Sequence, residues 1–315
     1  APAFESLFDA ASPPLSLLRR ARALWPELAA SMGLAINRSG AMAVGAPHEV
    51  GRWRADLADL GVRTTALSPA SVRRRATWLA GEPSGVWTGE DWRLEPPAAL
   101  EALRRAAEGL GVLWIGASVT GFAAGQATLG DRSSVACDVL VVASGASASL
   151  AGLAPELAFL APIKGHILRA QGLKLDGPVA RLKDLYICPS EGGALIGSTM
   201  EAGRSDRTVD AAQVAGLRAM AAGAAPIFAA APLEARAGVR AATPDGLPVV
   251  GMSRTPGVWL AAGARRNGWL LAPLIARALV EALVEGRNSP ATRAFDPSRF
   301  DEARRSKAQA GGDDV

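Results

Sequence analysis

Residues 237–251 of this chain read AGVRAATPDGLPVVG, and residues 263–273 read GARRNGWLLAP. Asp245 and Gly246 in the first string form a turn signal in their own right. The second string opens an apolar run at 268–285, whose leucines and alanines recur at spacings of three and four and predict a long helix. Pro273 falls in or near the first turn of that helix, where proline is tolerated. Composition alone does not explain two strings of this kind.

The rest of the chain alternates helix-like and strand-like segments. Apolar periodicity predicts helices at 16–32, 48–60, 68–79, 96–110, 210–220 and 268–285. A strand should follow the fourth of these at 112–115, which is the helix–strand step of an α/β layer. The helix at 96–110 begins with two prolines, and we expect its buried face to carry Leu100, Leu103, Ala107 and Leu110.

The strongest predicted strand is 135–144. Its apolar run at 139–143 should be buried on both faces, and it ends in a turn of small residues, Ser144 and Gly145. Strand-rich segments without helices lie near 35–45 and 160–200. Because these segments interleave with α/β segments, we predict an α/β fold with an α+β admixture, in two domains between which the chain crosses several times. The polar residues 304–315 are expected to form a disordered tail.

Composition argues against several classes of function. The 315 residues carry a net charge of +4 and 49% are hydrophobic. No apolar run reaches about 18 residues, so we expect no integral membrane span. Residues 1–5 contain no basic region followed by an apolar stretch, so we expect no signal peptide, and we predict a cytoplasmic location. Two cysteines and two histidines do not make a disulfide framework or a His-rich metal centre. The basic residues are dispersed without interleaved aromatics, which argues against nucleic acid as a partner. No Gly-x-Ser-x-Gly elbow supports a serine hydrolase.

Three further strings complete a pattern. Residues 162–166 read PIKGH, residues 186–189 read YICP and residues 193–200 read GALIGSTM. Together with the two longer strings they resemble the glycine oxidase and D-amino-acid oxidase family of FAD-dependent amine oxidoreductases, over nearly the whole chain. The resemblance implies FAD as cofactor, a small amino acid or amine as substrate and molecular oxygen as the electron acceptor.

The resemblance also implies which residues form the site. Arg240 would bind the substrate carboxylate through its guanidinium fork, with help from the Tyr186 hydroxyl and with Arg266 and Met200 nearby. No catalytic base is evident, and His166 is not expected to be one. The start of the helix at 268 would face the flavin edge that gains negative charge on reduction. The residues implied to contact FAD are Val119, Ala143, Ser144, Gly145, Gly238, Arg266, Asn267, Gly268, Trp269 and Leu270.

A division into domains follows from the same resemblance. Residues 1–35, 94–150 and 236–290 would form what remains of a Rossmann-like, three-layer FAD-binding domain. Residues 36–93 and 151–235 would form an interleaved substrate-binding domain on a mostly antiparallel sheet, and residues 291–315 a C-terminal tail. The implied activity is oxidative deamination, with a possible homo-oligomer as the working form. The resemblance to glycine oxidase also implies a role in thiamine biosynthesis. The alternatives are a D-amino-acid dehydrogenase or a sarcosine-oxidase-like enzyme.

The sequence departs from the family pattern at two points. Ala264 stands where the family often has histidine. No Gly-x-Gly-x-x-Gly fingerprint for the ADP half of FAD occurs, and residues 1–6 resemble the segment after the family's first βαβ unit, so roughly forty to fifty residues would be missing. An alternative from another class is therefore a non-catalytic fragment or a partner-dependent subunit, with an unpaired sheet edge and uncovered apolar surface.

Overall fold

The computed structural model describes residues 1–287 and 289–300, and these divide into two compact units. Unit 1 contains residues 1–112 and 164–239, and unit 2 contains residues 113–163 together with the chain from Arg240 onward. Two long strands, β8 (Ala161–Gln171) and β13 (Leu233–Ala242), carry the chain across the unit boundaries. The chain therefore passes between the two units more than once, and the predicted domain bounds and roles stay predictions.

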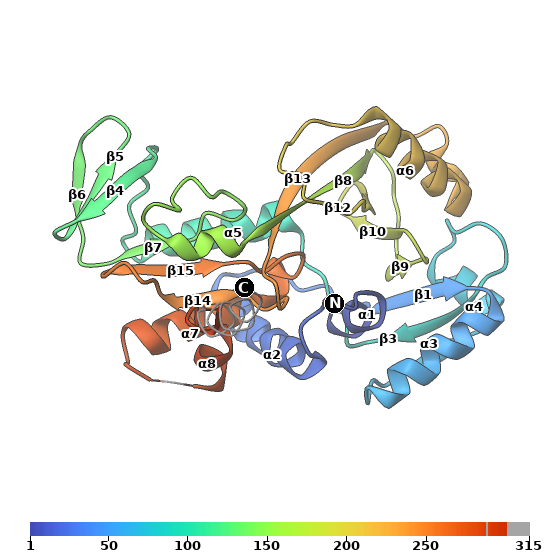
Figure 1. Ribbon diagram of the computed structural model, residues 1–315. Coiled ribbons are helices and arrows are strands. Elements are labelled where there is room, and N and C mark those ends of the chain that lie inside the picture. Colours follow the sequence, from blue (N-terminus) through green and yellow to red (C-terminus); the bar gives the residue numbers. More distant parts are fainter. Residues whose placement is uncertain (288, 301–315) are drawn as a thin grey trace, which may run out of the picture. The chain divides into compact units, whose positions relative to one another are not determined.

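Unit 1 is built on a nine-stranded sheet with the order β12-β8-β11-β10-β9-β1-β3-β2, in which β13 also pairs with β8 (Figure 1). The β1–β3, β2–β3, β9–β10, β10–β11 and β8–β11 pairs are antiparallel, whereas β1–β9 is parallel. The strands not yet given bounds are β1 (Ala41–Gly45), β2 (Thr65–Leu67), β3 (Ser84–Thr88), β9 (Val179–Arg181), β10 (Tyr186–Ser190), β11 (Gly193–Gly197) and β12 (Glu201–Ala202).

Helices cover both faces of this sheet because successive strand residues point to opposite sides. On one face, α6 (Ala211–Ala224) packs Leu217 against Ile187 and Ile196 of β10 and β11. The opposite face of β1 and β3 is covered by α1, α2 and α3, and Phe4 and Trp53 are the largest buried side chains there. The remaining helices of unit 1 are α1 (Pro2–Phe8), α2 (Leu15–Ser31), α3 (Pro47–Asp59), α4 (Pro69–Arg75), α5 (Pro96–Gly109) and the 3-10 turn η2 (Pro226–Phe228).

Unit 2 contains two three-stranded sheets. One has the order β14-β15-β7, with β14 and β15 antiparallel and β15 and β7 parallel, and the other has the order β4-β5-β6. Val142, Val258 and Leu260 form the core of the first sheet. The elements are β4 (Val119–Ala123), β5 (Gln126–Leu129), β6 (Ser134–Ala136), β7 (Leu140–Val142), β14 (Val249–Met252), β15 (Val258–Ala262), η1 (Pro155–Phe159), α7 (Gly268–Leu283) and α8 (Pro290–Phe295).

Most of the predicted helices are confirmed, and α2, α3, α5, α6 and α7 lie within a few residues of their expected bounds. The expected buried face of α5 is wrong. Leu100 and Leu110 are 60% and 86% exposed, and the buried residues are Ala99 and Ala102. Periodicity shows that residues share one face of a helix, but not that another element covers that face.

Two strand predictions are also wrong in part. Residues 112–115 form no strand, and Leu113 and Trp114 are 85% and 58% exposed. The run at 139–143 supplies only the short strand β7, with Val142 buried and Val141 exposed. Among residues 1–287 and 289–300, β7 pairs with β15 alone, so it is an edge strand rather than the doubly covered central strand that its composition suggested.

The last predicted segment, 291–315, lies partly within the described residues. Its first part is the helix α8 followed by a turn, and Phe295 and Phe300 are buried there, so this part packs on the unit rather than forming a tail. The expected disorder of 304–315 lies outside the described residues. Residues 1–35 and 94–112 group with unit 1, which also holds residues 36–93. The functional assignment of each unit stays a prediction.

Candidate functional site

The first part of the candidate site is one edge of the parallel strand pair in unit 2. Leu140 and Val142 of β7 stand opposite Val258 and Leu260 of β15, so the carboxyl ends of both strands lie at the same edge. Gly145 follows β7 with φ of +63°, a left-handed conformation that glycine adopts without strain. An added Cβ at Gly145 would meet nothing within 4 Å, so a flat ligand could approach this backbone closely.

The same edge leads into α7. Gly263, just after β15, has φ of +78°, and the turn that follows reaches Asn267, which is buried and precedes the helix. The Asn267 side chain makes no capping hydrogen bond to α7. The helix N-terminus, with its positive dipole end and backbone N–H groups, therefore lies at the carboxyl edge of the β7–β15 pair, where α/β sheets bind cofactors.

The end of β13 is fastened to this turn. The Arg265 N–H donates to the Ala241 carbonyl at 2.9 Å, and Ala242 forms an isolated antiparallel bridge with Ala264. Arg240 precedes Ala241 and is half-buried. The backbone of the predicted carboxylate-binding residue is thus adjacent to the turn that carries Arg266 and starts α7. The sequence placed these residues 26 positions apart, and the structure brings their backbones together.

The second part of the candidate site lies in unit 1, on the face of the nine-stranded sheet that α1 covers. Tyr186 at the start of β10 stands opposite Arg181 of β9 on one side and Gly197 of β11 on the other. An added Cβ on Gly197 would lie 2.7 Å from the Tyr186 Oη and 2.8 Å from its Cζ, so the tyrosine ring lies directly over this glycine. Only glycine leaves room for the ring in this position.

Arg181, whose side chain is 12% exposed, is a cation beside Tyr186 that no sequence pattern singles out. Its Nη2 lies 2.5 Å from the Glu5 Oε1 of α1. Burial opposes the charged form, but the Glu5 carboxylate outweighs this effect and the pKa of Arg181 is raised. The guanidinium therefore stays charged, and it ties α1 to the sheet row that contains Tyr186. The cross-strand register that pairs Arg181 with Tyr186 is not readable from the sequence.

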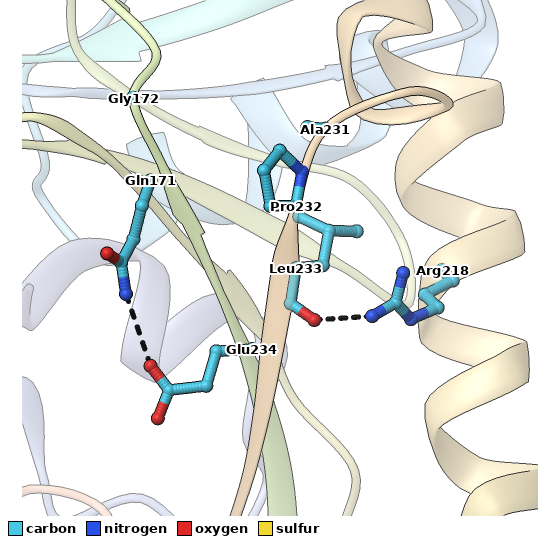
Figure 2. A pocket seen from close by; sticks show the side chains of 7 residues that line it. All are labelled: Gln171, Gly172, Arg218, Ala231, Pro232, Leu233 and Glu234. Atoms are coloured by element: carbon cyan, nitrogen blue, oxygen red, sulfur yellow. Dashed lines mark hydrogen bonds between the residues drawn. The ribbon is translucent and has the colours of Figure 1, made fainter.

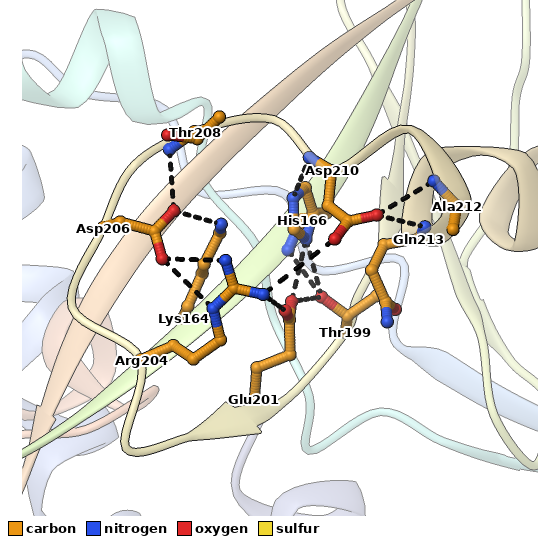
Figure 3. Close-up of polar contacts among 10 residues, drawn as sticks. All are labelled: Lys164, His166, Thr199, Glu201, Arg204, Asp206, Thr208, Asp210, Ala212 and Gln213. Carbon is orange, nitrogen blue, oxygen red and sulfur yellow. Dashed lines mark hydrogen bonds and ion pairs between the residues drawn. The ribbon is translucent and has the colours of Figure 1, made fainter.

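Beyond Tyr186, a network of polar side chains holds the segment between β11 and α6 onto β8 (Figure 3). His166 of β8 is fully buried. The Asp210 N–H donates to its Nε2 at 3.0 Å, and its Nδ1 lies 2.9 Å from the Glu201 Oε1. Because Nε2 accepts a hydrogen bond, the proton belongs on Nδ1, and neither nitrogen is available to remove a proton from a substrate. This agrees with the expectation that His166 is not a base.

Lys164, two residues earlier on β8, is the second anchor of this network. Its Nζ lies 2.5 Å from the Asp206 Oδ1, and the Arg204 Nη2 lies 2.9 Å from the Asp206 Oδ2. Lys164, with Arg204 in a smaller part, lowers the pKa of Asp206 far below its usual value. Lys164 and His166 therefore fix residues 199–210, the segment that contains Met200. The string PIKGH indicated a strand at this position, which is β8, but it did not indicate that the strand binds residues 199–210.

The remaining predicted site residues divide between the two units. Tyr186, Met200 and Gly238 belong to unit 1, whereas Arg240 belongs to unit 2 together with the residues predicted to contact FAD at 119, 143–145 and 266–270. Met200 is 39% exposed and Trp269 is 37% exposed. Val119 begins β4, in the other three-stranded sheet of unit 2. Whether the two groups face one substrate stays a prediction.

A pocket of about 760 Å³ in unit 1 contains none of these residues (Figure 2). It lies between the ends of β8 and β13 and α6. Its Gln171 Nε2 donates to the Glu234 Oε2 at 3.2 Å, and its Arg218 donates to the Leu233 carbonyl. These polar groups are engaged with one another, so the pocket offers little to a ligand. The described residues contain no cluster of three or more side chains suited to a metal ion.

The glycine turn, the parallel strand pair and the helix that begins beside it define an α/β protein of the cofactor-binding type. The chain belongs to the DAO family of FAD-dependent oxidoreductases, because the model of that family, described as "FAD dependent oxidoreductase", matches residues 5–282. FAD is the cofactor of this family. The recognition of the family and of its cofactor from the sequence is therefore confirmed.

Individual relatives point to the same family. The chain is 37% identical over 171 residues to the glycine oxidase of Geobacillus kaustophilus, covering 52% of this chain and 44% of that protein. It is 37% identical over 176 residues to the tRNA 5-methylaminomethyl-2-thiouridine biosynthesis bifunctional protein MnmC of Maricaulis maris, covering 55% of this chain and 28% of that protein. The matched part thus spans less than half the length of these relatives.

Solved structures confirm the fold. The glycine oxidase structure from Geobacillus kaustophilus superposes with a TM-score of 0.78 at 26% identity, covering 92% of this chain and 84% of the other. An iminodiacetate oxidase from Chelativorans sp. has a TM-score of 0.79 at 19% identity, with coverage of 92% and 85%, which shows a shared fold. The predicted fold class is therefore confirmed.

The residues at the β7–β15 edge fit the flavin half of FAD. Gly145 and Gly263 take left-handed conformations, a ligand can approach the backbone at Gly145, and α7 begins beside both. The sequence contains no Gly-x-Gly-x-x-Gly string, which is the motif that binds the ADP half of FAD. In the described residues, no helix is long and apolar enough to cross a membrane.

Proposed function

We propose that this chain serves the FAD-dependent oxidative deamination of a small amino acid or amine, in keeping with its family and with its similarity to a protein named glycine oxidase. The observation that carries the proposal is the junction of β13 with the turn before α7. There the Arg265 N–H to Ala241 carbonyl bond and the Ala242–Ala264 bridge hold the backbone of Arg240 next to the helix start that is predicted to face the flavin. Substrate binding and cofactor binding would thus share one rigid piece of backbone.

The chain's own residues would bind and orient the substrate. Arg240 would hold the carboxylate through two parallel hydrogen bonds, and the Tyr186 hydroxyl would add a third contact. Arg266 and Met200 would line the same site. FAD, when bound, supplies the redox chemistry by accepting a hydride from the substrate Cα at N5. His166 is engaged on both nitrogens and no other base is evident, so the amine should react in its neutral form.

The electron acceptor and the exact substrate belong to this proposal as well. We take molecular oxygen as the acceptor, and a D-amino-acid dehydrogenase or a sarcosine-oxidase-like enzyme as the alternatives within the class. A role in thiamine biosynthesis, a cytoplasmic location and a homo-oligomer stay predictions of the same kind.

An alternative of another class has a specific observation in its favour. Leu110, Leu113 and Trp114 are 86%, 85% and 58% exposed, and residues 112–115 form no strand. Apolar surface of this kind is usually covered in soluble proteins. This exposed apolar surface supports the alternative of a partner-dependent subunit, in which additional polypeptide would bind the ADP half of FAD.

One experiment separates the two candidates. The purified chain is incubated with FAD, freed of unbound cofactor, and its absorbance spectrum is recorded before and after anaerobic addition of glycine. Retained flavin bands that bleach with glycine would support the oxidase proposal. Retained bands that do not bleach would indicate that the substrate is an amine other than glycine, and D-alanine and sarcosine would then be tested. Loss of all flavin would favour the partner-dependent alternative.

A further inference from the structure

Unit 1 contains a second pocket, of about 440 Å³, lined by Arg22, Arg63, Thr64, Thr65, Trp87 and Trp92. These residues come from α2, from the segment before β2, from β2 itself, and from β3 and the turn after it. None of them belongs to the predicted flavin or substrate site. The volume lies within the usual range for small-ligand pockets.

Guanidinium groups lie over both indole rings of this pocket. The Arg38 and Arg22 Cζ atoms lie 4.5 Å and 4.9 Å from the Trp92 ring centroid, and the Arg75 Cζ lies 5.8 Å from that of Trp87. Each indole N–H is already used, since Trp87 donates to the Ser39 carbonyl and Trp92 to the Gly89 carbonyl, both at 3.0 Å. The rings are therefore fixed in place as flat surfaces with cations layered against them.

The pocket carries more positive than negative charge. Glu90 is its acidic side chain, and both of its oxygens are occupied by Arg19, at 2.8 Å each, with Arg22 at 3.4 Å. Arg63 is exposed, and its guanidinium makes no hydrogen bond or ion pair with any residue in 1–287 or 289–300. Its backbone is nevertheless anchored, because the Thr88 hydroxyl donates to the Arg63 carbonyl at 3.0 Å.

We propose that this pocket binds a nucleoside monophosphate group. The Arg63 guanidinium fork matches the oxygens of a phosphate, and the hydroxyls of Thr64 and Thr65 can add neutral hydrogen bonds to phosphate or ribose. A base of any identity could lie against an indole or guanidinium plane that borders the pocket, because every base has a π-face.

The same chemistry can come from two sources, a free nucleotide or one residue of a single-stranded RNA. Neither source is evident from the sequence, since the arginines and tryptophans that meet here are spread over residues 22–92 without forming a stripe. None of the residues that line this pocket belongs to the β7–β15 edge, whose residues are in unit 2. The inference does not depend on the proposed oxidase function.

The test is equilibrium dialysis of the whole chain with labelled UMP, chosen because FAD contains no uracil. We expect saturable binding that is stronger than that of inorganic phosphate. Arg63→Gln should weaken it by about tenfold, the usual effect of losing a charge-assisted hydrogen bond. The matched control is Arg54→Gln, since Arg54 is also exposed but lies on α3 outside the pocket, and it should change binding by less than about twofold.

A ten-residue oligouridine distinguishes the sources. Tighter binding than UMP, with a steep loss of affinity on raising salt, would identify an RNA strand, and equal binding would identify a free nucleotide. The proposal is overturned if UMP does not bind, if Arg63→Gln binds UMP as the unchanged chain does, or if inorganic phosphate binds as tightly as UMP.

Discussion

Replacing Gly197 by alanine should displace Tyr186, the tyrosine predicted to contact the substrate. The new Cβ would lie 2.7 Å from the Tyr186 Oη, 2.8 Å from Cζ and 3.0 Å from Cε1. Non-bonded carbon atoms prefer a separation of about 3.5 Å or more, so the ring must move by about 0.5–0.8 Å. Overpacking of this size costs about 1–3 kcal/mol of unfolding free energy. A shift of about 1 Å at a substrate-binding group can cost on the order of a hundredfold in rate.

The assay is a double-mutant cycle in thermal unfolding. Gly197→Ala is measured in the unchanged chain and in a Tyr186→Ala background, where the three clashing atoms are gone. We expect a lowered Tm in the first case, by about 2–4 °C per kcal/mol, and almost no change in the second. Gly216→Ala is the control, since an added Cβ in α6 meets nothing within 4 Å and alanine is the better helix former.

Kinetics provide the second readout once the FAD-loaded chain turns over. Gly197→Ala should raise the apparent KM for the amine substrate, and it should add little to Tyr186→Phe, which keeps the ring but lacks the hydroxyl. The reasoning is refuted if Gly197→Ala destabilises the Tyr186→Ala background as much as the unchanged chain, because the clash would then not involve the tyrosine ring.

Three further predictions concern other parts of the chain. Arg240→Lys should raise the apparent KM by on the order of a hundredfold, since an ammonium cannot replace the two-pronged contact with a carboxylate; an unchanged KM would remove Arg240 from the site. Glu156→Gln should cost about 1–3 kcal/mol at neutral pH in urea unfolding. Burial opposes ionisation of Glu156, but the Arg254 N–H at 2.8 Å and the Ser253 hydroxyl at 2.7 Å outweigh it and lower its pKa. The stabilisation by Glu156 is therefore present above the ordinary carboxyl pKa of 4.5 and fades as pH falls through the lowered pKa. The role of the Glu156 carboxylate would be contradicted if the unfolding free energies of the unchanged chain and of Glu156→Gln differed by the same amount down to strongly acidic pH. His166→Leu should speed hydrogen exchange of the Asp210 amide by about tenfold, because the substitution removes the nitrogen that accepts its hydrogen bond. The α3 amides serve as the internal reference. Unchanged exchange would mean that the segment is held by Lys164 alone.

The candidate site shows how far local patterns reach. The strings around Arg240 and Asn267 identified a family that the comparisons confirm, and they placed the start of α7 correctly. They did so because a turn, a helix start and a cofactor-facing backbone each need particular residues at fixed spacing along the chain. The ladder that places Arg181 beside Tyr186 escaped sequence reasoning, because register depends on which strands pair.

The sequence by itself determined the helices α2, α3, α5, α6 and α7 and the alternation of strands at 160–200, since period 3.6 and period 2 are properties of the chain alone. Only the tertiary structure decided that Leu100 is exposed, that β7 is an edge strand, and that Arg22, Arg63 and Trp92 line one pocket. The physical reason is the same in each case. Burial, pairing and charge clustering depend on contacts between residues far apart in the chain, and a local pattern carries no information about which of those contacts form.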